Sequence, residues 1–158
     1  MTAAMDLARI VELNAVYARV IDNGQFEEWP KLFHDPCLYK LTTAENVARG
    51  HEAGLIYADT RGMLEDRVSS LRKVNIYERQ RYRHIVGLPV VLGEQNGAAE
   101  VETPFLLVRV MRDGTTDLFA TGVYRDKVRP NEAGALRFAE RVVVCDGRRF
   151  DTLVAIPF

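Results

Sequence analysis

The chain has 158 residues, a formal net charge of −1, 47% hydrophobic residues and 27% charged residues. This length and balance are typical of one ordinary soluble globular domain, and no biased or low-complexity tract argues for disorder. Because the net charge is nearly zero, the chain has no overall attraction to nucleic acid or to an anionic membrane, and neither is an expected partner.

The first residues do not have the pattern of a secretory signal. Asp6, Arg9 and Glu12 stand where such a signal would be apolar. The apolar runs elsewhere are too short to span a membrane, so we expect a cytoplasmic protein. In a reducing compartment Cys37 and Cys145 are expected to be buried apolar thiols rather than a disulfide.

Two helices are predicted at the N-terminal end. Apolar residues from Leu7 to Ile21 recur with the spacing of one helix face, although the polar Asn14 interrupts them. Asn23 and Gly24 form a helix stop. A second, short helix is predicted from Phe26 to Phe33.

After a predicted first strand at residues 37–43, the short apolar stretch at 54–59 is ambiguous, and Gly62 to Lys73 predicts a third helix. The rest of the chain favours strands, because β-branched and aromatic residues alternate with turn-forming pairs such as Asn96-Gly97. Pro104 indicates an edge position or a bulge within one of these strands. The predicted strands are Tyr82–Leu92, Ala98–Arg112, Thr115–Arg129, Leu136–Cys145 and Thr152–Ile156.

Helices followed by a meander of long strands indicate an α+β fold, in which a curved antiparallel sheet wraps onto the N-terminal helices. Neither an internal repeat nor a linker divides the chain. We therefore expect a single domain over residues 1–158.

No motif for a metal or cofactor site is present. His34, His51 and His84 are scattered, and neither cysteine has a histidine within two residues, as an iron–sulfur centre of the Rieske type would require. The phosphate-binding loop, the dinucleotide glycine fingerprint and the GxSxG elbow are also absent. We expect no catalytic, cofactor-binding or metal-binding residue on this chain.

An acid/base enzyme is the alternative. A curved sheet over helices can enclose a pocket, and a carboxylate held in an apolar pocket can act as a base near neutral pH. The residues with suitable side chains are Asp22, Tyr39, Asp59 and His84. Each also has an ordinary structural explanation, such as a helix end for Asp22.

Residues 78–84 form an unusual arginine-rich segment. In a strand, alternation places Arg79, Arg81 and Arg83 on one face and Tyr82 with His84 on the other. Three guanidinium groups in a row indicate either a solvated face with local ion pairs or a protein–protein interface, where arginine is enriched. Both interpretations remain open at this point.

The C-terminal Pro157 and Phe158 are apolar, which suggests burial against a partner. Together with the arginine row, this end of the chain defines the predicted subunit interface. Its candidate residues are Arg79, Arg81, Arg83, His84 and Phe158.

Three segments, Asp22 to Tyr39, Tyr57 to His84 and Arg141 to Pro157, follow a family pattern in order and spacing. They resemble the small (β) subunits of aromatic-ring-hydroxylating dioxygenases. The run from Asn75 to His84 with Gly87-Leu88-Pro89 is most similar to the terephthalate dioxygenase type. Val86-Gly87 departs from the Ser/Thr-Asn that most family members place after the histidine, which indicates a subgroup.

The resemblance implies the cone-shaped fold of nuclear transport factor 2 and ketosteroid isomerase. It also implies a non-catalytic structural subunit in a hexamer of three small and three large subunits. The large subunit would hold a Rieske cluster and a mononuclear iron. The complex would be an oxidoreductase that uses NADH and dioxygen, with electrons from a separate reductase, to cis-dihydroxylate terephthalate or a similar aromatic carboxylate. No cofactor is expected on this chain.

Overall fold

A computed structural model describes residues 6–51, 54–74, 80–147 and 156–158. The helices and 3-10 turns are α1 (Leu7–Asp22), η1 (Phe26–Glu28), η2 (Pro30–Leu32), α2 (Ala44–Ala48) and α3 (Arg61–Val74). The strands are β1 (Phe33–Thr43), β2 (Ile56–Ala58), β3 (Gln80–Val86), β4 (Val90–Gln95), β5 (Ala98–Met111), β6 (Thr116–Pro130) and β7 (Leu136–Cys145). The predicted strand Thr152–Ile156 lies largely outside the described residues.

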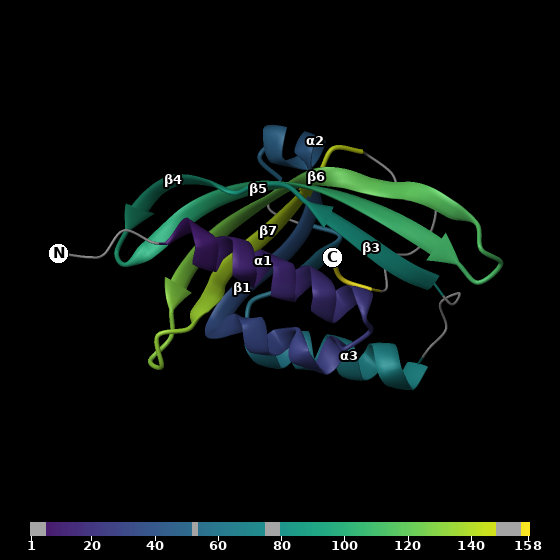
Figure 1. Cartoon of the computed structure of the whole chain (residues 1–158), viewed down its shortest axis with the longest axis horizontal. Helices are drawn as coiled ribbons and strands as arrows, with labels where there is room; N and C mark the ends of the chain where they lie inside the picture. The colour runs from purple at the N-terminus through teal and green to yellow at the C-terminus, as the bar shows by residue number, and fades with distance from the viewer. Residues whose placement is uncertain (1–5, 52–53, 75–79, 148–155) are drawn as a thin grey trace.

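The described strands form one curved sheet in the order β2-β1-β7-β6-β5-β3, with β4 also paired to β5. β1 and β7 run parallel, and the other pairs are antiparallel. Figure 1 shows α1 and α3 on one face of this sheet and the short α2 on the other. The predicted α+β fold with a curved sheet on N-terminal helices is confirmed.

α1 covers the sheet with its apolar side. Asp6 caps its first turn by accepting a hydrogen bond from the Ala8 amide at 3.0 Å, and Asn23 follows its last residue as predicted. The helix packs against β3 and β7. Its buried apolar residues are Ile10, Leu13, Tyr17, Ala18, Val20 and Ile21.

The predicted helix from Phe26 to Phe33 is wrong. The structure has two 3-10 turns there, and Phe33 already begins β1, four residues before the predicted strand. Pro30 explains the difference, because it lacks the amide hydrogen that would continue an α-helical ladder. The third predicted helix is confirmed as α3, and the ambiguous stretch contains β2.

The predicted strand Tyr82–Leu92 is two strands, β3 and β4, separated by residues 87–89. Pro104 of β5 faces this break, and its carbonyl accepts a hydrogen bond from the Gly87 amide at 2.8 Å. A Cβ atom on Gly87 would lie 2.7 Å from the Pro104 ring, so only glycine fits this approach. Pro104 has no amide hydrogen to donate, and it lies where the hydrogen bonds of β5 to β3 and to β4 are interrupted. This agrees with the predicted edge position or bulge at this proline.

The sheet has two faces of different character. Along β5 the odd-numbered residues from Ala99 to Arg109 are buried and the even-numbered ones are exposed or half-buried. We call the helix-covered side the inner face and the other side the outer face. Edge-to-face and tilted aromatic contacts fill the centre of the inner side, among Tyr17, Trp29, Phe33, Tyr39, Tyr124 and Phe138.

Candidate functional site

The inner face holds a buried carboxylate–imidazole pair. Asp22 ends α1, and its Oδ1 lies 2.6 Å from Nδ1 of His84 on β3. Its Oδ2 accepts a hydrogen bond from the His84 amide at 2.9 Å. Both carboxylate oxygens are therefore engaged, and the pair joins the end of α1 to the sheet.

Of the four acid/base candidates, the structure joins only Asp22 and His84. The Tyr39 hydroxyl donates to the Phe158 carbonyl at 2.9 Å and accepts from the Phe158 amide at 3.2 Å. Asp59 is exposed in the bend after β2. Tyr39 thus anchors the C-terminal residue, while Asp59 faces solvent.

Phe158 does not lie at the surface. Its side chain is 0% exposed within the chain itself and contacts the rings of Tyr82, Phe105 and Phe119. The expectation that this apolar end is buried against a partner is corrected: the sheet's own aromatic residues bury it. His84 is likewise buried within the chain, so neither residue is accessible to another subunit.

The structure describes two of the three arginines of the predicted row. Arg81 and Arg83 are exposed on the outer face of β3, while Tyr82 and His84 between and after them are buried, as the alternation predicts. Arg79 lies outside the described residues. Arg83 approaches Asp22 only to 3.9 Å, and Arg81 has no ion pair with any described residue.

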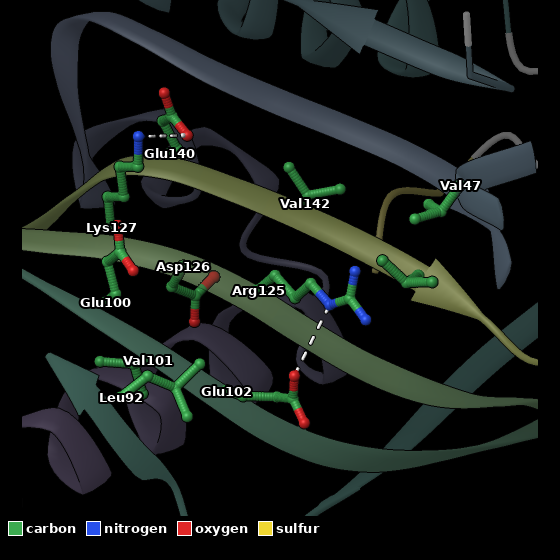
Figure 2. A pocket seen from close by; sticks show the side chains of 11 residues that line it. Val47, Leu92, Glu100, Val101, Glu102, Arg125, Asp126, Lys127, Glu140 and Val142 are labelled. Carbon is green, nitrogen blue, oxygen red and sulfur yellow. Dashed lines mark ion pairs between the residues drawn. The ribbon is translucent and has the colours of Figure 1, made fainter. Parts of the chain in front are cut away.

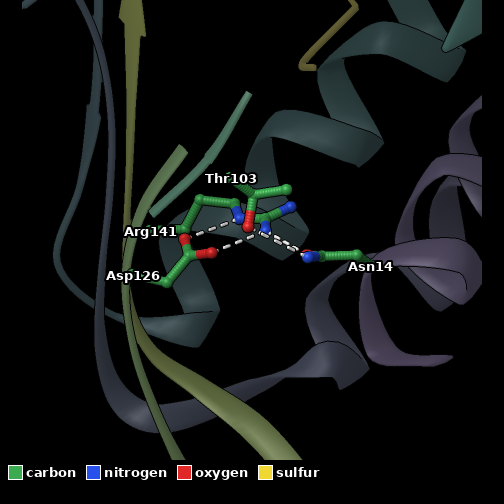
Figure 3. Close-up of polar contacts among 4 residues, drawn as sticks. All are labelled: Asn14, Thr103, Asp126 and Arg141. Atoms are coloured by element: carbon green, nitrogen blue, oxygen red, sulfur yellow. Dashed lines mark hydrogen bonds and ion pairs between the residues drawn. The ribbon is translucent and has the colours of Figure 1, made fainter. Parts of the chain in front are cut away.

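A charged cluster lies deeper in the inner side and was not identified from the sequence. Arg141 of β7 is fully buried and donates two hydrogen bonds of 2.8 Å to the Asp126 carboxylate on β6. It also donates to the side-chain carbonyl of Asn14, whose amide donates to Thr103 at 3.3 Å. Figure 3 shows these four side chains converging between α1 and the sheet.

Aromatic rings surround the same guanidinium group. Its central carbon lies 3.9 Å from the ring centre of Tyr124, 4.0 Å from that of Phe138 and 4.3 Å from that of Tyr17. Burial opposes the charge, but the Asp126 carboxylate outweighs it and raises the pKa of Arg141. This cluster explains the polar Asn14 within the apolar stripe of α1. The interior of the cone is thus occupied here by protein side chains.

The outer face carries a shallow groove of about 500 Å³ across β4 to β7 and α2. Figure 2 shows apolar side chains there, including Val47, Leu92 and Val142. Two exposed ion pairs of 3.6 Å border it, namely Glu102–Arg125 and Lys127–Glu140.

The described residues contain no group of three His, Cys, Asp or Glu side chains placed to hold a metal ion. Cys37 and Cys145 are free and buried, which confirms the prediction for the thiols. Burial raises the pKa of Cys37 to about 11 and that of Cys145 to about 12, so both stay protonated at neutral pH. In the described part of the chain, no helix is both long and apolar enough to cross a membrane.

Comparisons with known proteins match nearly the whole chain. A family model described as "ring hydroxylating beta subunit" matches residues 17–152. Subunit beta 1 of the terminal oxygenase component of terephthalate 1,2-dioxygenase from Comamonas sp. is 45% identical over 94% of this chain and 96% of that protein. The anthranilate 1,2-dioxygenase small subunit from Burkholderia cepacia is 33% identical over 89% of this chain and 87% of its own length.

Solved structures agree with this match. A beta subunit assigned to an aromatic-ring-hydroxylating dioxygenase of Novosphingobium aromaticivorans is 34% identical, with a TM-score of 0.87 over 96% of both chains. The beta subunit of benzoate 1,2-dioxygenase from Burkholderia mallei has a TM-score of 0.76 over 99% of this chain and 100% of its own. At 16% identity, the latter supports the fold alone.

Proposed function

Because the chain belongs to the family of ring-hydroxylating dioxygenase beta subunits, we propose that it is the non-catalytic small subunit of a terminal oxygenase that dihydroxylates terephthalate or a similar aromatic carboxylate. The near-full-length similarity to subunit beta of the terephthalate enzyme carries this proposal. In this role the chain acts as one domain over residues 1–158, located in the cytoplasm.

The proposed partner is a large subunit that holds a Rieske iron–sulfur cluster and a mononuclear iron, assembled as three large and three small subunits. A reductase would deliver electrons from NADH to the large subunit. The chemistry of this chain supports such a division of labour. A Rieske cluster takes two cysteines and two histidines as ligands, and neither of the two cysteines of this chain has a histidine within two residues.

The contribution of this chain is therefore assembly. Arg81 and Arg83 are exposed on β3, where guanidinium groups can form bidentate pairs with carboxylates of a neighbouring subunit. We retain these two arginines as interface residues of the complex. His84 and Phe158 contribute indirectly, by holding β3, α1 and the C-terminal residue together.

Co-expression with the proposed large subunit is the direct test. We expect the two chains to purify together in equal amounts, with iron bound to the complex and none on this chain expressed alone. With a reductase and NADH, the complex should convert terephthalate into its cis-dihydrodiol, measured by chromatography. Stoichiometric iron on the isolated chain, or no binding to the large subunit, would contradict the proposal.

A standalone acid/base enzyme is the second candidate, and one observation favours it: the Asp22–His84 pair is desolvated and short. However, the second carboxylate oxygen is committed to the His84 amide, so the pair has a complete structural explanation. Turnover of an isomerase or dehydratase substrate by the isolated chain, abolished by Asp22→Asn, would support this candidate.

A further inference from the structure

A groove with an apolar floor lies where α1, η2 and the start of β7 meet. Leu13, Leu32 and Leu136 line it as buried side chains, and Val16 of α1 is 41% exposed beside them. The groove has a volume of about 330 Å³, at the lower end of the roughly 300–1,000 Å³ that ligand pockets occupy. Its size and floor therefore suit a small molecule with an apolar body.

Two arginines line the same groove. Nη2 of Arg9 donates to the carbonyl of Gly134 in the β6–β7 turn, and Nη1 of Arg137 donates to the Leu136 carbonyl at 2.7 Å. Neither guanidinium group forms an ion pair with any described residue. Because a guanidinium group has five N–H donors, each keeps donors for a further acceptor. Backbone carbonyls thus orient both cations without neutralising them.

More positive charge lies around Arg137. Arg129 is directly opposite it in the pairing of β6 with β7, and like charges at opposed positions of a sheet repel each other. Nε2 of His34 on β1 lies 3.0 Å from the Arg129 carbonyl. Burial lowers the pKa of this imidazole, and the guanidinium groups of Arg129, Arg61 and Arg137 lower it further. An anion bound at Arg137 would relieve this repulsion.

We propose that this basic groove binds a small carboxylate with an apolar body. The residues that carry the proposal are Arg9, Leu13, Val16, Leu32, Leu136 and Arg137. The carboxylate accepts hydrogen bonds from the two guanidinium groups, which outnumber the one carboxylate of the groove, that of Glu12. Phosphate would satisfy the same donors but would leave the apolar floor in water, so an organic acid fits better. The proposal does not depend on the proposed function.

The test is a calorimetric titration of the full chain, expressed alone, with benzoate as the probe. We expect saturable binding of benzoate that weakens as salt is added, because salt screens exposed charges. Benzamide has the apolar body without the charge, and acetate has the charge without the apolar body. Each should bind at least roughly fivefold more weakly than benzoate.

Variants of the groove locate the site. Arg9→Met and Arg137→Met should each weaken benzoate binding by roughly tenfold, because each removes a charged donor. Arg19→Met is the matched control, since Arg19 is an exposed arginine of α1 that does not line the groove, and it should have no effect. Glu12→Gln should instead strengthen binding by roughly twofold, because it removes a like charge near the ligand. A merely structural role of these residues would not produce this gain.

Thermal melting of each variant separates loss of binding from loss of folding. The absence of saturable benzoate binding by the natural chain would overturn the proposal. Equal affinities for benzoate and acetate would also overturn it, because the apolar floor would then contribute nothing, and so would equal losses in Arg137→Met and Arg19→Met. The titration contains no large subunit, so its failure leaves the proposed function standing. Failure of the chain to bind the large subunit would likewise leave the basic groove untouched.

Discussion

Arg125 and Asp126 are neighbours on β6, yet they point to opposite faces of the sheet and have different surroundings. Arg125 pairs with Glu102 at 3.6 Å on the outer face, where both side chains are exposed. Asp126 pairs with Arg141 at 2.8 Å on the inner face, where both are almost completely buried. Water screens the first pair, while removal of one partner of the second leaves a charge in the core. One strand thus stabilises the fold with one face and presents exposed charged side chains to solvent with the other.

The largest effect is expected for Arg141→Met, which leaves the Asp126 carboxylate buried without its partner. We expect a loss of about 3–5 kcal/mol in the free energy of unfolding, measured by urea denaturation. The double variant Arg141→Met/Asp126→Leu should lose much less, because no charge is left behind. Equal losses in the two variants would mean that the cluster contributes packing rather than charge pairing.

Asp22→Ala should have the next largest effect, because two hydrogen bonds between α1 and β3 are lost. We expect a loss of roughly 1.5–3 kcal/mol in unfolding free energy, and a smaller loss for Asp22→Asn, which keeps one acceptor. Product formation per assembled complex should stay unchanged. A fall in turnover by the folded complex would instead give this inner-face pair a role in the reaction.

Glu27 and Arg72 also form an exposed ion pair. Its two contacts, of 2.7 and 2.9 Å, are shorter than the 3.6 Å contact between Arg125 and Glu102. The hydrogen bond from Arg72 lowers the pKa of Glu27 from 4.5 to about 2. Because the folded-state value is the lower one, the stabilisation is present above pH 4.5 and is lost as the pH falls toward 2. After discounting for solvent screening, Glu27→Gln should cost about 0.5 kcal/mol at pH 7. In urea titrations at several pH values, this difference should shrink below pH 4.5.

The smallest effect is expected for Glu102→Gln on the outer face. The exposed pair with Arg125 should contribute so little that the free energy of unfolding changes by less than about 0.5 kcal/mol. The same denaturation measurement, run beside the Arg141 variants, tests the contrast between the two faces. A loss above 2 kcal/mol would show that the outer face also stabilises the fold.

Most elements could be predicted from local pattern, and each failure has an identifiable cause. Periodicity identified α1 and α3, and alternation with turn residues identified β5, β6 and β7. Pro30 and Gly87 were the exceptions: the first ends a helical pattern, and the second interrupts a strand pattern where it lies against Pro104. The interaction with Pro104 joins residues 17 positions apart in sequence, so a local window could not reveal it.

The buried charged cluster around Arg141 shows more clearly what could not be predicted from the sequence. Asn14, Asp126 and Arg141 come from three elements and are ordinary polar residues in the sequence. Asn14 was the one visible signal, because a polar residue in the apolar stripe of α1 requires a buried partner. The identity of that partner depends on the register of β6 against β7 and on the packing of α1 over both.

The sequence by itself determined the fold class, the alternation that exposes Arg81 and Arg83, and the family, because these depend on residue periods and on the order of many modest matches. The tertiary structure decided which residues are available to a partner. Sequence patterns could not show that the C-terminal Phe158 returns to the inner face, where the Tyr39 hydroxyl and three aromatic rings bury it. Burial arises from contacts between residues distant in sequence, and only the folded, curved sheet brings those residues together.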